Sequence, residues 1–277
     1  MTLSNYLETQ YINHAVKGAN LPTALTNLFF SLHSVDPADT GANEVTSTYL
    51  SGRASYTSSN FTSPATNADN RQITNTAILN YGNAIAASSG IPFLGIWDAA
   101  TGGNFLWSIK LQTSSGADSP LIFGNGDTVQ FAIGAIALRL DILKWSIYIR
   151  DIQLNWLRGI TGVAAIATSY MGLHSTLFAD GTGAELTTTV RAAGRLAIAS
   201  TAWDAIATSG VATITKNSNN IDFGLSAGNA FGYTRIGFWN AASAGNLIFI
   251  GVSLAPQDIT TGMPVFFTAG SISAGFS

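Results

Sequence analysis

The segment Gly95–Asn104 reads GIWDAATGGN, and the segment Gly237–Asn246 reads GFWNAASAGN. From Gly95 to Gly237 is 142 residues, which is about half of the 277-residue chain. Repeats of this kind have to be found before a fold is assigned, because a missed repeat misplaces every element. The two segments predict that the chain is a tandem duplication.

Other landmarks recur in the same order at nearly the same offset. The matching pairs are Leu32-His33-Ser34 with Leu173-His174-Ser175, Gly52-Arg53 with Gly194-Arg195, Glu44 with Glu185, and Lys17-Gly18 with Arg158-Gly159. Near the end of each copy the offset falls to 136, from Gly126 to Gly262, so the second copy lacks a few residues of a loop. A period of this length is the size of a whole domain. We therefore predict two domains, residues 1–141 and 142–277, with a boundary near Leu140 to Lys144.

The composition is apolar and unusually poor in charge. Hydrophobic residues make up 47% of the chain and charged residues only 10%, against about 25% charged in typical soluble domains. Two explanations stay open: partners cover much of the surface, or the surface is polar without being charged. The net charge of −3 and the absence of any Lys/Arg run argue against nucleic-acid binding. The absence of cysteine excludes disulfides, thiolate metal sites and thiol catalysis.

Neither a signal peptide nor a membrane span is evident in the sequence. The N-terminal residues MTLSNYLE have no basic region followed by an apolar stretch. The longest apolar run, Phe131 to Leu138, is closed by Arg139 and is too short to cross a bilayer. We expect a protein that is made in the cytoplasm and does not insert into a membrane.

Each copy opens with a helical pattern and continues with short strands. Apolar residues recur at helical spacing in 3–16 and 147–157, with Ser4 as a candidate cap and Gly18 and Gly159 as stop signals. Strands are expected at 28–32, 93–97, 104–111 and 128–138, and in the second copy at 169–173, 234–239, 246–254 and 264–273. The Ser/Thr/Asn-rich stretches 57–75 and 213–220 are expected to be solvated strands or long loops. This pattern predicts a mainly β fold of two sandwich or barrel domains, each with an N-terminal amphipathic helix.

The candidate metal ligands have stronger structural explanations. His33 and His174 end matched strands without a second ligand at a fixed short spacing, so structural histidines are favoured. Asp36, Asp39 and Glu44 could attract calcium, but they lack the order of a calcium loop, and the second copy keeps only Asp180 and Glu185. The loop 178–183 of the second copy is expected to be a turn. We predict that no metal or cofactor is bound.

An enzyme would need paired carboxylates or an activated nucleophile. Asp98 is replaced by Asn240 and Asp127 by Met263, so neither carboxylate is kept in both copies. Phosphate-binding, dinucleotide-binding and nucleophile-elbow motifs are absent from the sequence. We predict that the protein is not an enzyme.

The tryptophans of the repeated segment could stack on a sugar, but a Trp beside a tight turn more often seals the hairpin. What persists between the copies is the set expected for a hairpin turn, so we assign a structural role to this motif. Its residues are Trp97, Asp98, Gly102, Gly103, Asn104, Trp239, Asn240, Gly245 and Asn246.

The ordered motifs together carry a resemblance. The first copy has an LSNYL helix that ends in Lys17-Gly18, an SxDPxxxG loop, a Gly-Arg segment, the GIWDAATGGN phrase and a final strand that ends LRLD. This set resembles a family of tailed-bacteriophage virion structural proteins, labelled tail fibre, minor tail or capsid cement proteins. The second copy departs from it at Asn240, lacks the Asp-Pro turn, and ends Gly275-Phe276-Ser277.

The resemblance implies jelly-roll-like β-sandwich domains without enzymatic activity, carried on the virion. The leading hypothesis is a capsid cement or decoration protein that bridges major capsid subunits, because the short β-repeats and heptads of fibre shafts are missing from the sequence. The alternative is a minor tail or tail-fibre component that binds a receptor, and a further alternative is a carbohydrate-binding module. The expected partners are the major capsid protein or other virion proteins, with self-association and without nucleic acid or membrane.

Overall fold

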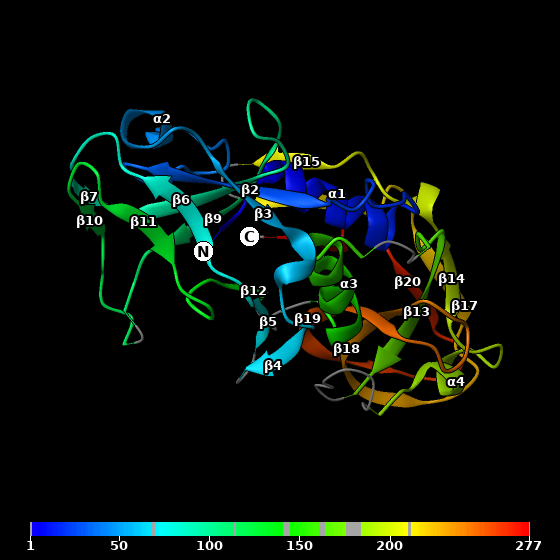
Figure 1. The fold of residues 1–277 in the computed structure, drawn as a ribbon. Coiled ribbons are helices and arrows are strands. Elements are labelled where there is room, and N and C mark those ends of the chain that lie inside the picture. Colours follow the sequence, from blue (N-terminus) through cyan, green and yellow to red (C-terminus); the bar gives the residue numbers. More distant parts are fainter. Residues whose placement is uncertain are drawn as a thin grey trace. The chain divides into compact units, whose positions relative to one another are not determined.

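The computed structural model describes residues 2–67, 70–113, 115–140, 145–160, 164–175, 184–209 and 212–276 (Figure 1). It is mainly β, with antiparallel strand pairing throughout the described ladders, so the predicted fold class is confirmed. The predicted boundary residues 141–144 and the loop 178–183 with Asp180 lie outside the described residues. Within the described part of the chain, no helix is long and apolar enough to cross a membrane.

The chain forms two compact units. Unit 1 comprises Met1–Thr9, Pro22–Asp141 and Gln153–Gly162, and unit 2 comprises Gln10–Leu21, Ile142–Ile152 and Val163–Ser277. Most of each unit comes from one sequence repeat, but each also contains a helical segment of the other repeat. The limits 1–141 and 142–277 remain a prediction about the sequence repeats.

Unit 1 is built on a five-stranded sheet in the order β1-β9-β8-β2-β3. These strands are β1 (Thr2–Leu3), β9 (Phe105–Lys110), β8 (Phe93–Trp97), β2 (Asn27–His33) and β3 (Ala54–Thr57). Three smaller sheets accompany it: β12 (Ala137–Leu140) with β5 (Asn70–Thr74) and β4 (Ala65–Asn67), β11 (Thr128–Phe131) with β6 (Leu79–Asn83), and β10 (Leu121–Phe123) with β7 (Ser88–Ile91). A short helix α2 (Thr46–Tyr49) and a 3-10 turn (Ser58–Asn60) complete the unit.

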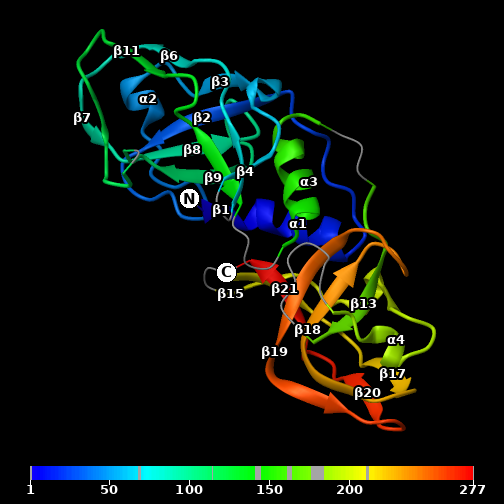
Figure 2. The ribbon, with the colours of Figure 1, turned by 90° about the horizontal axis from the view of Figure 1, so that it is seen from below.

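Unit 2 repeats this plan with a four-stranded sheet in the order β14-β13-β18-β19. Its strands are β14 (Leu196–Ala199), β13 (Thr168–His174), β18 (Ala230–Trp239) and β19 (Leu247–Ile259). Strands β13, β18 and β19 of this sheet are labelled in Figure 2. The smaller sheets are β15 (Ala207–Ser209) with β16 (Ala212–Lys216) and β21 (Ser273–Phe276), and β17 (Ile221–Leu225) with β20 (Pro264–Phe267). Helix α4 (Thr187–Val190) and a 3-10 turn (Ser200–Ala202) match those of unit 1.

The shorter loop of the second repeat merges two hairpins into one. In unit 1, β7 and β10 form a sheet of their own, in which Ser88 pairs with Phe123. The equivalent pair in unit 2, Ala230 with Ile259, lies on the same ladder as the repeated hairpin. Loss of residues between the two strand segments therefore lets β18 and β19 continue as single long strands, with shifts of register along their ladder.

The long helices begin and end where the sequence predicts. Helix α1 spans Asn5–Val16 and helix α3 spans Ile147–Leu157. Ser4 Oγ accepts a hydrogen bond from Leu7 N at 3.2 Å, and Ser146 Oγ accepts one from Ile149 N at 3.3 Å, as N-cap residues do. Gly18 and Gly159 follow the helices at φ +70° and +77°, a conformation that glycine adopts without strain.

The core of unit 2 forms between its layers. The large sheet contributes Leu173, Phe238 and Phe249, and the β17–β20 sheet contributes Phe223 and Val265. All five side chains are buried. Packing two β layers around one apolar core is the arrangement expected of a sandwich.

Three expectations about the strands need correction. The predicted strand 128–138 is two strands, β11 and β12, because the chain turns at Gly134 with φ +76°. The predicted strand 264–273 is likewise divided into β20 and β21, with Gly270 at φ +75°. The stretch 213–220 contains strand residues as expected, but Thr213 is buried rather than solvated, because β16 lies between β15 and β21.

Candidate functional site

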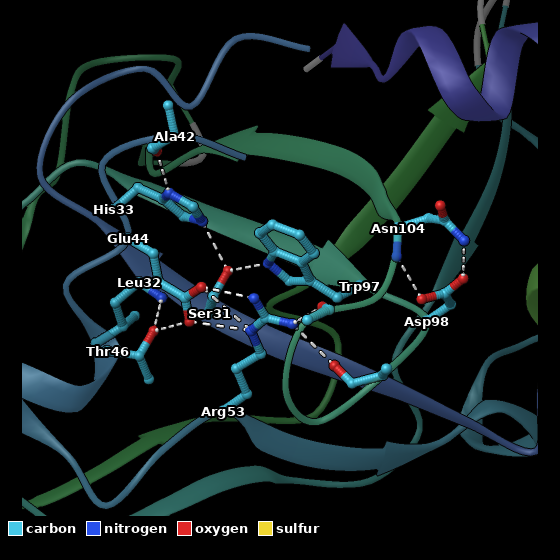
Figure 3. A network of polar contacts seen from close by, with 12 residues as sticks. Ser31, Leu32, His33, Ala42, Glu44, Thr46, Arg53, Trp97, Asp98 and Asn104 are labelled. Carbon is cyan, nitrogen blue, oxygen red and sulfur yellow. Dashed lines mark hydrogen bonds and ion pairs between the residues drawn. The ribbon is translucent and has the colours of Figure 1, made fainter. Parts of the chain in front are cut away.

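The repeated segment forms the turn of a β-hairpin in both repeats. Asp98 Oδ1 accepts a hydrogen bond from Asn104 N at 2.6 Å, and Asp98 Oδ2 accepts one from Asn104 Nδ2 at 2.6 Å (Figure 3). In the second repeat, Asn240 Oδ1 accepts the bond from Asn246 N at 2.7 Å. The turn requires an acceptor oxygen rather than a charge, which explains why Asp98 can be replaced by Asn240.

A glycine is required at one position of this turn. Gly103 and Gly245 have φ +75° and +72°. A Cβ at Gly103 would lie 2.4 Å from Asp98 Oδ1, and one at Gly245 would lie 2.6 Å from Asn240 Oδ1. The preceding position is less restricted, because Ala244 replaces Gly102.

An arginine side chain binds the backbone of this turn. Arg53, which precedes β3, donates from Nη1 to the Ala99 carbonyl at 2.9 Å and to the Gly102 carbonyl at 2.8 Å. Its guanidinium carbon lies 3.7 Å from the centroid of the Trp97 ring. The planar group therefore stacks on the aromatic face while its edge binds the turn backbone.

A glutamate fixes the guanidinium in this position. Arg53 Nη2 lies 2.7 Å from Glu44 Oε2, and Nε lies 3.0 Å from Glu44 Oε1. Thr46 Oγ1 donates to Glu44 Oε1 at 2.9 Å and accepts from Leu32 N at 2.8 Å. Burial raises the pKa of the Glu44 carboxyl, but the hydrogen bonds from Arg53 and Thr46 outweigh it and leave this pKa below its usual value. We call Glu44, Arg53 and Trp97 the first clamp.

The second repeat contains the same clamp. Arg195 Nη2 lies 2.9 Å from Glu185 Oε2, and its guanidinium carbon lies 3.8 Å from the Trp239 ring centroid. Arg195 Nη1 donates to the carbonyls of Ala241 at 3.2 Å and Ala244 at 2.7 Å. We call Glu185, Arg195 and Trp239 the second clamp.

Behind the first clamp lies a chain of hydrogen bonds through His33. His33 Nδ1 lies 2.7 Å from the Ala42 carbonyl, which can only accept, so this nitrogen carries the proton. Nε2 therefore accepts from Ser31 Oγ at 2.7 Å, and Ser31 Oγ accepts from Trp97 Nε1 at 2.8 Å. Burial lowers the pKa of His33, which favours the neutral imidazole that has this pattern of donors and acceptors.

The second repeat lacks the hydroxyl of this chain. Gly172 stands at the position of Ser31, and the His174 ring stacks on Trp239 with centroids 6.2 Å apart. Burial lowers the pKa of His174 to about 4. Both histidines are thus core residues beside a clamp.

The geometry does not resemble a catalytic or sugar-binding centre. Trp97 and Trp239 are 8% and 5% exposed, and each carries a guanidinium on its ring, so sugar stacking on these rings would need rearrangement. Glu44 binds Arg53, whereas Asp36 Oδ1 caps a turn by accepting from Ala38 N. In the described ranges, no three His, Cys, Asp or Glu side chains form a group that could hold a metal ion.

In the sequence, the clamp residues Arg53 and Arg195 serve only as landmarks of the repeat, and Glu44 and Glu185 are in addition members of a weak calcium pattern. No short motif predicts their role, because Glu44 lies 53 residues before Trp97 in sequence. The available signal is that Glu44 and Arg53 recur as Glu185 and Arg195 in so weakly charged a chain.

A second feature is an apolar face on the strand pair β17–β20, formed by Leu225, Met263, Pro264 and Phe266. Leu225 is 69% exposed and Phe266 is 51% exposed. Leu225 pairs with Pro264, and Phe266 follows two residues later on the same strand. Pro264, Phe266 and the paired Leu225 share the outer face, because Val265 between the first two is buried, and the exposed Met263 directly precedes them.

The first repeat carries polar side chains at all four equivalent positions. They are Asn83, Asp127, Thr128 and Gln130, each of them exposed. Thr128 pairs with Asn83 in the same register, and its Oγ1 donates to Asn83 Oδ1 at 3.0 Å. The strand pair therefore folds with a polar outer face, so its own fold does not require the apolar side chains of the second repeat. Clustered exposed apolar side chains are typical of interaction surfaces.

Comparison with known families gives a match over both repeats. A family described as Podophage GP4 fiber I protein gp80 matches residues 2–139 and again residues 144–275. The two matched segments confirm that the chain is a duplication of one family unit. No curated protein matches the chain.

We predict that replacing the arginine of either clamp destabilises the protein. Arg53→Lys or Arg195→Lys removes the planar group that binds a carboxylate and two carbonyls at once, so the free energy of unfolding should fall by about 1 to 3 kcal/mol. Urea denaturation followed by tryptophan fluorescence measures this change. Arg139→Lys, at an exposed position, is the control and should stay within about 0.5 kcal/mol of the wild type. Equal stability of all three variants would contradict the structural role of the clamps.

We also predict that acid destabilises the fold. Burial lowers the pKa of His14, His33 and His174, the last to about 4, from an ordinary value of 6.5. Between the folded and unfolded pKa values, the unfolded chain binds more protons than the folded one. The contribution of the neutral histidines to the free energy of unfolding is therefore complete above pH 6.5 and decreases as the pH falls. Protonation of Glu44 and Glu185, whose pKa values are also lowered, adds a further loss below 4.5.

Urea midpoints measured across this pH range test the prediction. The His174→Gln variant should show a smaller loss of stability between pH 6.5 and about 4 than the wild type, because one of the linked protons is gone. A wild-type midpoint that stays constant over this range would show that the histidines are not held neutral.

Proposed function

Because the chain belongs to the family described as Podophage GP4 fiber I protein gp80, we propose that it is a structural component of a podophage tail fibre. The single observation that supports this proposal is the family match over both repeats, which spans nearly the whole chain. At a coarser level, the chain is a phage virion structural protein with a tandem duplication.

The family match favours the tail-fibre alternative over the capsid-cement hypothesis. The cement hypothesis relied on the missing heptads and short β-repeats of a fibre shaft. A fibre also contains compact domains at its ends and joints, and two β units suit such a position better than a shaft. We place the protein in the tail on this ground.

The internal chemistry supports a structural role without catalysis. In each clamp, the charged groups of Arg and Glu bind each other and the backbone of a turn, which leaves them occupied by the fold. Groups used in this way stabilise a rigid hairpin rather than process a substrate.

The apolar face is our candidate for a contact with another virion protein. Exposed Leu225 and Phe266 lose contact with water when such a partner binds, which favours association. Since the first repeat is polar at the same positions, the two repeats would make different contacts in the assembled particle.

The first test locates the protein on the particle. Antibody-gold labelling of purified virions should mark the tail, and a deletion phage should assemble filled capsids that adsorb poorly. Labelling spread over the capsid, with normal adsorption and reduced heat resistance of the deletion phage, would restore the cement hypothesis and reject the tail-fibre proposal.

The second test addresses the apolar face. The variant Leu225→Asn, Pro264→Thr, Phe266→Gln introduces the residues of the first repeat, so each change should alter stability by no more than about 0.5 kcal/mol. Its incorporation into virions, measured by mass spectrometry of purified particles, should drop well below that of the wild type. The control variant is Ile78→Asn, Ile133→Ala. It replaces two other exposed apolar residues of the first repeat by the residues of the second repeat. Wild-type incorporation of the triple variant would exclude the apolar face as an assembly contact.

A further inference from the structure

The division of the two long helices between the compact units has a consequence for folding. Residues Gln10–Leu21, which belong to the first repeat in sequence, are part of unit 2. Residues Gln153–Gly162, which belong to the second repeat, are part of unit 1. Each unit therefore receives the C-terminal half of a helix from the other repeat.

The received helix segment forms a substantial part of the core of unit 2. Ile12, Ala15 and Val16 are fully or almost fully buried, in one apolar cluster with Trp203 and Phe238. Tyr11 is also buried, and its ring lies 6.3 Å from that of Phe276. The segment is thus a core element of unit 2 and not a linker.

The contacts at the helix ends are equivalent in the two units. In unit 2, Lys17 Nζ donates to the Trp203 carbonyl at 2.9 Å. In unit 1, Arg158 Nε donates to the Phe61 carbonyl at 3.1 Å. Phe61 and Trp203 are equivalent residues, 142 apart, as Lys17 and Arg158 are equivalent at 141.

The glycines that follow these basic residues are also equivalent. A Cβ at Gly18 would lie 3.2 Å from Ser200 Cβ in unit 2, and a Cβ at Gly159 would lie 3.4 Å from Ser58 Cβ in unit 1. Ser58 and Ser200 are again 142 residues apart. Both helix ends therefore fit closely against the same site of the fold, a 3-10 turn, which accounts for the retention of the basic-Gly pair in both repeats.

The segment received by unit 1 is held in the same way. Leu154, which lies 142 residues after Ile12, is fully buried. Trp156 Nε1 donates to the Pro22 carbonyl at 2.7 Å. The exchange is reciprocal, and removal of either segment would open an apolar core to water.

We propose that the two repeats are obligate folding partners, joined by the reciprocal exchange of their helix ends. The interaction surface of each repeat is its site for a helix that ends in a basic residue and glycine, and its partner is another repeat of the same family. A single repeat can complete its core only by binding a second one. The proposal is independent of the tail-fibre assignment.

The first experiment cuts the folded chain. A protease recognition sequence is inserted between residues 141 and 142, the full-length protein is purified and cleaved, and the product is analysed by size-exclusion chromatography with light scattering. The expected result is one species with the mass of the intact chain, which separates only in denaturant. Two separate folded monomers after cleavage would overturn the proposal.

The second experiment distinguishes exchanged helices from an ordinary association of two complete domains. Hydrogen exchange is measured by mass spectrometry on the full chain for the matched variants Ile12→Ala and Leu154→Ala. Ile12→Ala should speed exchange at least about tenfold in β13 and β18 of the second repeat, with a smaller effect on β2 and β8. Leu154→Ala should show the opposite preference.

Milder variants keep the test usable if a buried truncation prevents folding. Lys17→Met removes the hydrogen bond to the Trp203 carbonyl, and Arg158→Met removes the bond to the Phe61 carbonyl. They should loosen the 3-10 turns Ser200–Ala202 and Ser58–Asn60 respectively. If each variant affects only the repeat that carries it, the helices are not exchanged and the proposal is wrong.

Discussion

Each repeat depends on one arginine that stacks on a tryptophan ring and donates hydrogen bonds to a glutamate and to two backbone carbonyls. Arg53 and Arg195 connect the entry to β3 or β14 with the turn of the central hairpin, and Glu44 and Glu185 are held beside the buried histidines by a backbone bridge. A guanidinium suits this position because it is planar, always charged and able to bind several acceptors at once. In a chain with 10% charged residues, two ion pairs among the described residues fix the equivalent turn in each repeat.

The two repeats keep their common interior and differ on their surfaces. The clamp, the turn glycine and the acceptor at Asp98 or Asn240 are retained, whereas the outer face of one strand pair changes from polar to apolar. Inside, the second repeat has lost the Ser31 hydroxyl and keeps a neutral histidine stacked on Trp239. A duplicated domain can change its surface at little cost to stability as long as the groups that hold its hairpin remain. The duplication thus provides the same hairpin architecture twice, with a different outer face on each repeat.

Much of the fold could be predicted from the sequence because its signals are local. Helix starts at Ser4, helix stops at Gly18 and Gly159, and the Trp-containing hairpin all follow from residue type and spacing over a few positions. The last strand was predicted too long, because Gly134 lies in a run that reads as apolar and its turn is set by packing of β11 and β12 in different sheets. The clamp was not predicted at all, because Glu44, Arg53 and Trp97 are brought together only when three separate segments fold onto one sheet.

By itself, the sequence determined that the chain is a duplication, that it is mainly β, and that Trp97 and Trp239 precede equivalent turns. These features follow from repetition and periodicity, which are properties of the chain read in order. Only the tertiary structure decided which charged residues meet and which core each helix completes. An amphipathic pattern shows that the face with Ile12 must be buried, but burial is non-directional and any sufficiently apolar surface satisfies it. Which core the helix completes is decided by contacts between residues more than 180 positions apart in sequence, such as that of Lys17 with Trp203.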